Sequence, residues 1–163
     1  MATNNEINLN KPVPAFQSDS FDDQTNVTGD GSVYQVLFPT PLFNNGNCFA
    51  PLTSIFTAPF TGLYVAYLTM GIDSAGTIPH LMRYYIVADG LVYELLRMDW
   101  RNIRRAAGTF EMNGLSVMLP MTAGSTAIVN IVGYNGTKNC SLTGEDNSGD
   151  RTPLLSIIRL TGL

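Results

Sequence analysis

The sequence predicts an all-β fold, a sandwich or a barrel of many short strands. Short segments rich in aromatic and β-branched residues recur along the chain, and clusters of glycine, proline and asparagine separate them. No internal repeat, coiled coil or collagen-like run interrupts this pattern. The 163 residues are enough for one domain with a core between two sheets.

The expected strands follow one another closely along the chain. In order, they are residues 13–16, 33–38, 54–58, 63–70, 81–88, 91–100, a short strand at Phe110, 115–119, 126–134 and 153–160. Pro14 restricts the first strand to a sheet edge. Ala88-Asp89-Gly90 is a hairpin signal.

Other segments are expected to be turns or loops, and one is ambiguous. Residues 26–31 and 44–47 have turn chemistry, and Pro39 and Pro41 end the strand before them. Residues 135–152 are expected to form a long polar loop whose one apolar residue is Leu142. Residues 91–107 also fit helical spacing, so a helix there is an alternative to a strand followed by a loop.

The charge content narrows the classes of partner. Charged residues make up 13% of the chain, against roughly 25% in an average globular protein. This low share fits a homo-oligomer with much of its surface covered, and it equally fits an uncharged extracellular or virion-type surface. The net charge of −4 and the scarcity of lysine argue against nucleic-acid binding, which normally uses a basic face.

We expect two parts in the chain. Residues 1–12 are rich in asparagine and lack periodicity, which indicates a flexible tether or attachment peptide, and residues 13–163 form the domain. Neither a secretory signal nor an apolar run of membrane-spanning length is visible. We therefore expect a soluble protein made in the cytoplasm of a host cell, without membrane insertion.

Few residues offer reactive chemistry. His80 is the single histidine and stands in an expected loop, so the sequence holds no cluster of histidines for metal binding and no catalytic residue is assigned. Cys48 and Cys140 match no metal or redox spacing, and they form either one disulfide or two buried thiols. We expect no enzymatic activity.

Two segments carry candidate binding residues. The only tryptophan, Trp100, stands beside Arg101, Asn102 and Arg104. An indole ring that stacks on a pyranose, with polar neighbours for the hydroxyls, suits glycan recognition; a core or subunit-interface position is the other interpretation. Glu145, Asp146 and Asp150 offer oxygen ligands that suit Ca²⁺, but they lack the EF-hand spacing, so a solvated loop is the alternative.

Several motifs together resemble C1q-like (TNF-like) jelly-roll domains. Phe16 stands where that family has a buried phenylalanine, and residues 56–64, with Phe56, Phe60, Gly62 and Tyr64, match its strand–turn–strand motif, so we expect all five residues to build the core and to carry no chemistry. Residues 113–119 and 123–125 match a later strand and turn, with Ser125 where aspartate is usual. The closing strand lacks the family's Phe-Ser-Gly.

The resemblance implies a C1q/TNF-like jelly-roll β-sandwich that forms a homotrimer. Residues 26–34 and 43–49 resemble the variant found in bacteriophage fibre heads and virion-surface proteins. We therefore expect a trimeric fibre head or capsid decoration that binds a host surface glycan or protein, attached to other virion proteins through its N-terminus. The alternative is a structural trimer that decorates or caps the particle without a host ligand; an enzyme such as a glycan hydrolase is a third interpretation.

Overall fold

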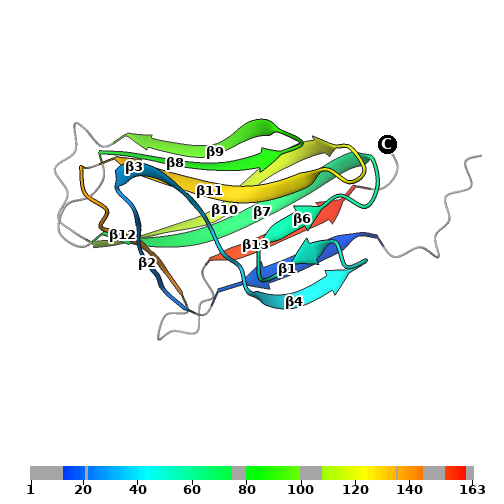
Figure 1. The fold of residues 1–163 in the computed structure, drawn as a ribbon, viewed down its shortest axis with the longest axis horizontal. Helices are drawn as coiled ribbons and strands as arrows, with labels where there is room; N and C mark the ends of the chain where they lie inside the picture. The colour runs from blue at the N-terminus through cyan, green and yellow to red at the C-terminus, as the bar shows by residue number, and fades with distance from the viewer. Residues whose placement is uncertain are drawn as a thin grey trace, which may run out of the picture.

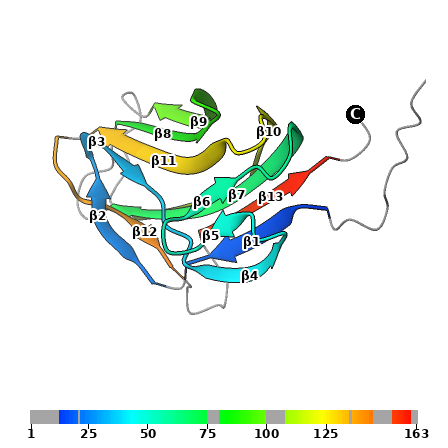
Figure 2. The same cartoon turned by 45° about the vertical axis from the view of Figure 1, so that its right-hand side comes forward.

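The protein is a sandwich of two β-sheets, which Figures 1 and 2 show from two directions. The computed structural model describes residues 13–20, 22–74, 80–99, 108–134, 136–144 and 153–160, and within these ranges all regular secondary structure is β-strand. Every pairing between strands of a sheet is antiparallel. The predicted all-β class is therefore confirmed.

The larger sheet is organised around one long strand, β7 (Gly62–Ser74). The sheet has the order β2-β12-β7-β13-β1-β4, and β10 pairs with the other edge of β7. The other strands are β1 (Ala15–Asp19), β2 (Gln24–Thr28), β4 (Thr40–Asn45), β10 (Gly108–Met121), β12 (Cys140–Thr143) and β13 (Leu154–Arg159). β13 and β12 share one edge of β7 because each covers only part of its length.

The smaller sheet has the order β5-β6-β11-β8-β9. Its strands are β5 (Phe49–Ala50), β6 (Ile55–Thr57), β8 (Leu81–Ala88), β9 (Leu91–Asp99) and β11 (Thr126–Tyr134). The remaining strand, β3 (Asp30–Gln35), lies along β11 (Figure 1). A bridge from Gly29 to Tyr134 and a hydrogen bond from the Val36 N–H to the Val129 carbonyl (2.9 Å) hold it there.

The core lies between the sheets and contains a row of aromatic rings. Phe16 stacks on Phe49 at a centroid distance of 4.1 Å and on Phe56 at 5.5 Å, and Phe56 meets the edge of Tyr64 at 5.4 Å. Phe16, Phe56 and Tyr64 are fully buried, as the sequence predicted. The Tyr64 hydroxyl donates to the Phe60 carbonyl at 2.7 Å, which satisfies the polar end of this buried ring.

Phe60 and Gly62 differ from the core positions predicted for them. Phe60 is 41% exposed because it lies in the turn before β7, where the Arg159 guanidinium stands 5.1 Å from its ring centroid. Gly62 opens β7 and is half-buried. A Cβ at Gly62 would lie 3.1 Å from the Arg159 Nε, so close packing accounts for the glycine here.

Several predicted boundaries are also corrected by the sheet pairing. β1 is an inner strand between β13 and β4, not the edge strand that Pro14 predicted. Pro14 comes before the first residue of β1, Ala15, so its missing N–H removes no hydrogen bond from within the strand. Residues 26–31 hold the end of β2 and the start of β3, with Gly29 between them at φ +128°. β3 ends at Gln35, and Pro41 lies inside the edge strand β4.

The polar segment 135–152 contains a strand that composition did not reveal. β12 pairs with β7 on one side and β2 on the other, and these distant partners impose the extended conformation on four residues. β9 replaces the helix that was an alternative for residues 91–107, as far as Asp99. The predicted bounds of β8 and β11 are confirmed without change.

Candidate functional site

The predicted glycan-binding residues Trp100, Arg101, Asn102 and Arg104 lie outside the described ranges. The strands on either side of them are described. Asp99, the last residue of β9, pairs with Leu81, and Gly108, the first residue of β10, pairs with Ser74. β9 therefore ends, and β10 begins, at the same end of the sandwich, the left-hand end in Figure 1.

The predicted calcium ligands Glu145, Asp146 and Asp150 also lie outside the described ranges. They follow Gly144, whose N–H donates to the Asp23 Oδ1 at 2.7 Å. Within the described part of the chain, no group of three or more His, Cys, Asp or Glu residues is placed to hold a metal ion. A calcium site at residues 145–150 stays a prediction.

Both cysteines are buried free thiols, so the second of the two alternatives holds. Burial raises the pKa of the Cys48 thiol, which donates towards the Asn45 carbonyl at 3.4 Å. His80 is exposed, and its backbone N–H donates to the Tyr134 carbonyl at 3.0 Å.

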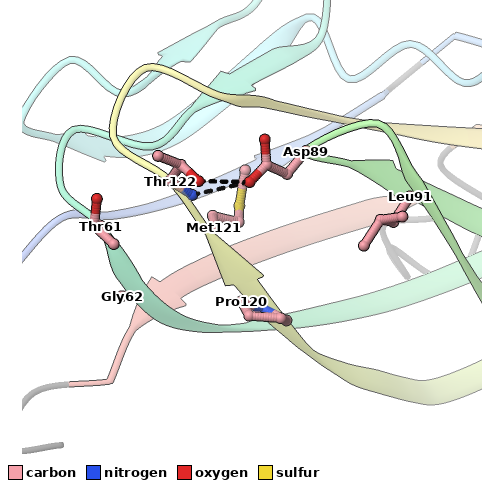
Figure 3. Close-up of a pocket in the computed structure, with 7 residues that line it drawn as sticks. All are labelled: Thr61, Gly62, Asp89, Leu91, Pro120, Met121 and Thr122. Atoms are coloured by element: carbon pink, nitrogen blue, oxygen red, sulfur yellow. Dashed lines mark hydrogen bonds between the residues drawn. The ribbon is translucent and has the colours of Figure 1, made fainter.

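At the opposite end of the sandwich, three turns surround a shallow depression of about 460 Å³ (Figure 3). Asp89 and Gly90 form the two-residue turn between β8 and β9, both with positive φ, as a type I′ hairpin requires. The second turn joins β10 to β11, and the third leads into β7. The lining residues are Thr61, Gly62, Asp89, Leu91, Pro120, Met121 and Thr122.

Side-chain hydrogen bonds fix these turns to one another. The Asp89 Oδ2 accepts from the Thr122 N–H (3.2 Å) and from the Thr122 hydroxyl (2.7 Å), as Figure 3 shows. The Ala123 N–H donates to the Thr61 Oγ1 at 3.0 Å. These hydrogen bonds preorganise the depression before any ligand binds. The Asp89 carboxylate lies at its rim, and Met121 is buried beneath it.

The lining limits what this depression does chemically. Asp89 is its one titratable side chain, and its other walls are apolar or carry threonine hydroxyls. General acid–base catalysis needs an acid and a base held at defined positions around the substrate. The lining of this depression provides a single titratable group, the Asp89 carboxylate. The sequence marked Asp89 as a hairpin residue, but its contact with Thr122, 33 residues away, had no local signal.

A second surface is the outer face of the larger sheet. Directly paired residues on neighbouring strands point to the same face of a sheet. One row runs Met118, Val65, Ile158, Ala15, Asn45, and the next runs Ser116, Tyr67, Ser156, Gln17, Phe43. Neither row contains a charged side chain, and Met118 (59%), Ile158 (42%), Tyr67 (39%) and Phe43 (38%) are exposed. These two rows of the outer face are therefore mostly apolar and uncharged, whereas Asp73 lies further along the same face of β7.

A third surface is the side of the sandwich between β9 and β10. Each is an edge strand of its sheet, and the two lie next to each other. Half-buried apolar side chains from these strands pack against the core: Tyr93, Leu95, Leu96, Met98, Leu115 and Val117. The core is thus incompletely covered on this side, which we name the open side.

Comparison with known proteins identifies the fold. The sequence matches no family model and no curated protein. The globular domain of zebrafish complement 1qA protein aligns with a TM-score of 0.58 at 11% identity, over 93% of this chain and all of that one. Murine APRIL, crystallised at pH 8.5, aligns with a TM-score of 0.56 at 17% identity, over 91% and 100% of the two chains.

These likenesses give the fold class. The chain has the jelly-roll fold of TNF-family and C1q globular domains, as its motifs implied. A second murine APRIL structure, at pH 8.0, agrees, with a TM-score of 0.56 and 16% identity over the same shares of the two chains. Within the described residues, no helix has the length and hydropathy needed to cross a membrane.

Proposed function

We propose that the chain is the subunit of a homotrimeric recognition module without enzymatic activity. The observation that carries this proposal is that one subunit presents two different apolar surfaces, the outer face of the larger sheet and the open side between β9 and β10. Each is an unfavourable surface for a monomer, because exposed apolar area costs free energy in water.

The two surfaces suit contact with each other in neighbouring copies. A contact between two different patches of the same chain is heterologous, and repetition of such a contact closes into a ring when the rotation between copies is suitable. The ten residues of the two outer-face rows are uncharged, as the cores of protein interfaces are. Three copies are the assembly typical of C1q and TNF-family domains, which share this fold.

The assembly is tested by the mass in solution. We expect light scattering to give about three times 17.7 kDa. Met118→Asp places a charge in the outer-face row and is expected to lower the mass to that of one subunit. Val33→Asp changes a residue of nearly equal exposure, 58%, on β3, and is expected to leave the trimer intact. A monomeric wild-type protein would refute the proposal, and a trimeric Met118→Asp variant would refute the assigned surface.

The finer parts of the function extend this proposal. In a trimer, the same end of all three sandwiches faces one direction. Three equivalent weak sites can then bind one surface together, and the overall affinity rises through multivalency. We place the ligand, a host surface glycan or protein, at the end of the sandwich where β9 ends and β10 begins. We place the protein on a virion surface, attached through residues 1–12. The low charge of the chain supports such a surface.

Ligand binding is tested separately from assembly. Trp100→Ala and Arg101→Ala are expected to remove binding to a glycan array or to host cells while the trimer mass stays unchanged. Wild-type protein that forms trimers and stabilises particles but binds no glycan or cell would favour a purely structural decoration. Dissociation of the trimer by EDTA would place a metal ion, such as the Ca²⁺ expected at residues 145–150, in the assembly.

A further inference from the structure

The turn at the end of β4 contains three asparagines, and only one of them precedes a glycine. The turn runs Asn44, Asn45, Gly46, Asn47, and the Asn47 N–H donates to the Asn44 carbonyl at 3.4 Å across it. Gly46 has a φ of +84° and Asn47 a φ of +49°. Asn45 is both the last residue of β4 and the first of an exposed Asn-Gly pair.

The side chains of the first two asparagines differ in how they are held. The Asn44 amide donates to the Phe49 carbonyl at 2.8 Å and accepts from the Phe49 N–H at 3.2 Å, so its side chain is fixed. Neither the Asn45 side chain nor the Gly46 N–H has a hydrogen-bond partner within the described ranges. No atom lies within 4 Å of the position that a Cβ of Gly46 would occupy.

These features place an unhindered nucleophile next to a free amide. We propose that Asn45 is a self-modification site, where the Gly46 backbone nitrogen attacks the Asn45 side-chain carbon. The nitrogen loses its proton, a C–N bond forms, and ammonia leaves, which gives a cyclic imide. Water then opens the imide at either carbonyl and leaves an isoaspartyl or aspartyl residue at position 45. The co-reactant is water, and no oxidant or reductant is consumed.

The modification has a consequence for assembly, which rests on the proposed function. Asn45 pairs with Ala15, so it ends the row that runs through Ile158 and Val65 to Met118 on the outer face of the larger sheet. Conversion places a negative charge at the end of an uncharged row. The isoaspartyl product also adds a backbone carbon at the end of β4. Both changes are expected to weaken the trimer.

Peptide mapping of the full chain tests the chemistry directly. We incubate the protein at mildly alkaline pH in water enriched in the oxygen isotope ¹⁸O. We expect one ¹⁸O atom to be incorporated at position 45, in a mixture of isoaspartyl and aspartyl peptides. Asn45→Gln, whose longer side chain forms the imide ring far more slowly, is expected to stay unlabelled in this turn. Asn44 is the internal control. Absence of label at position 45, or equal labelling at Asn44, would overturn the proposal.

Light scattering on the same samples separates the chemistry from its consequence. We expect the share of monomer to rise with conversion in the wild type but not in Asn45→Gln. Asn45→Asp reproduces the charge without the extra backbone carbon and is expected to weaken the trimer from the start. Conversion with an unchanged trimer would overturn the effect on assembly. A wild type that is monomeric before conversion would refute the proposed function and leave the chemistry of Asn45 standing.

Discussion

Thr28 is a buried residue whose hydroxyl joins strands that are far apart in the sequence. Its hydroxyl donates to the Ser32 carbonyl at 2.7 Å and accepts from the Gly133 N–H at 2.9 Å. The side chain is fully buried at the end of β2, and Gly133 is buried on β11. The substitution Thr28→Val keeps the shape of the side chain and removes both hydrogen bonds.

The expected loss follows from the two groups left behind. The Gly133 N–H stays buried without a partner, which costs about 1–3 kcal/mol, and the half-buried Ser32 carbonyl loses a bond worth about 0.5–1.5 kcal/mol. We therefore expect Thr28→Val to lower the free energy of unfolding by about 1.5–4.5 kcal/mol. Thr28→Ser is the matched control, because it keeps the hydroxyl and loses one methyl group, at about 1 kcal/mol.

Urea unfolding measures this difference at one fixed protein concentration, because subunit association contributes to the apparent stability. The slope with urea is expected to be the same for both variants, since both unfold the same surface. Hydrogen exchange of the Gly133 amide is a local readout, and we expect its protection to fall more in Thr28→Val. A valine variant as stable as the serine variant would refute the assigned role of the hydroxyl.

Two further predictions concern buried and exposed rings. Tyr84→Phe removes a fully buried hydroxyl that has no partner within the described ranges, so we expect thermal and urea unfolding to show a gain of about 1 kcal/mol at neutral pH. Because burial raises the Tyr84 pKa well above 10, only the unfolded state loses this proton near pH 10, and we expect wild-type stability to fall above that pH more steeply than that of Tyr84→Phe; parallel pH profiles would contradict this. Phe56→Ala is expected to cost about 3–5 kcal/mol in urea unfolding, because it empties part of the core. Phe60→Ala loses mainly the contact with Arg159 and is expected to lower the free energy of unfolding by about 1 kcal/mol or less. Equal losses in Phe56→Ala and Phe60→Ala would show that Phe60 contributes to the core as Phe56 does.

Local signals predicted the strands that are bounded by their own turn chemistry. β8 and β11 begin and end where the sequence predicted, because Asp89-Gly90 and Gly124 take the positive φ values that their turns need. β12 escaped prediction because its extended conformation comes from pairing with β7 and β2, and pairing partners are invisible to a local pattern. Phe60 was misassigned to the core because the motif match places it in a turn but does not reveal that its ring is exposed there.

The functional surfaces were harder to predict than the fold for the same reason. The depression rests on Asp89 and Thr122, which only the packed turns bring together. The outer-face row needs the register of three strand pairings before Met118 and Ala15 are known to share a face. The segments predicted to bind glycan and calcium lie outside the described ranges, so their roles stay predictions.

The sequence of β7, read together with the place of the strand in the fold, nevertheless supports the proposed assembly. A strand with one face in water alternates apolar and polar residues, whereas residues 63–70 are apolar at every position except Thr69. Tyr64, Ala66 and Leu68 face the core, so the second sheet accounts for them. Val65 and Tyr67 face outward, where no element of the described chain covers them fully. A central strand that is apolar on both faces fits a second cover, and another copy of the chain is the cover that the proposed trimer would provide.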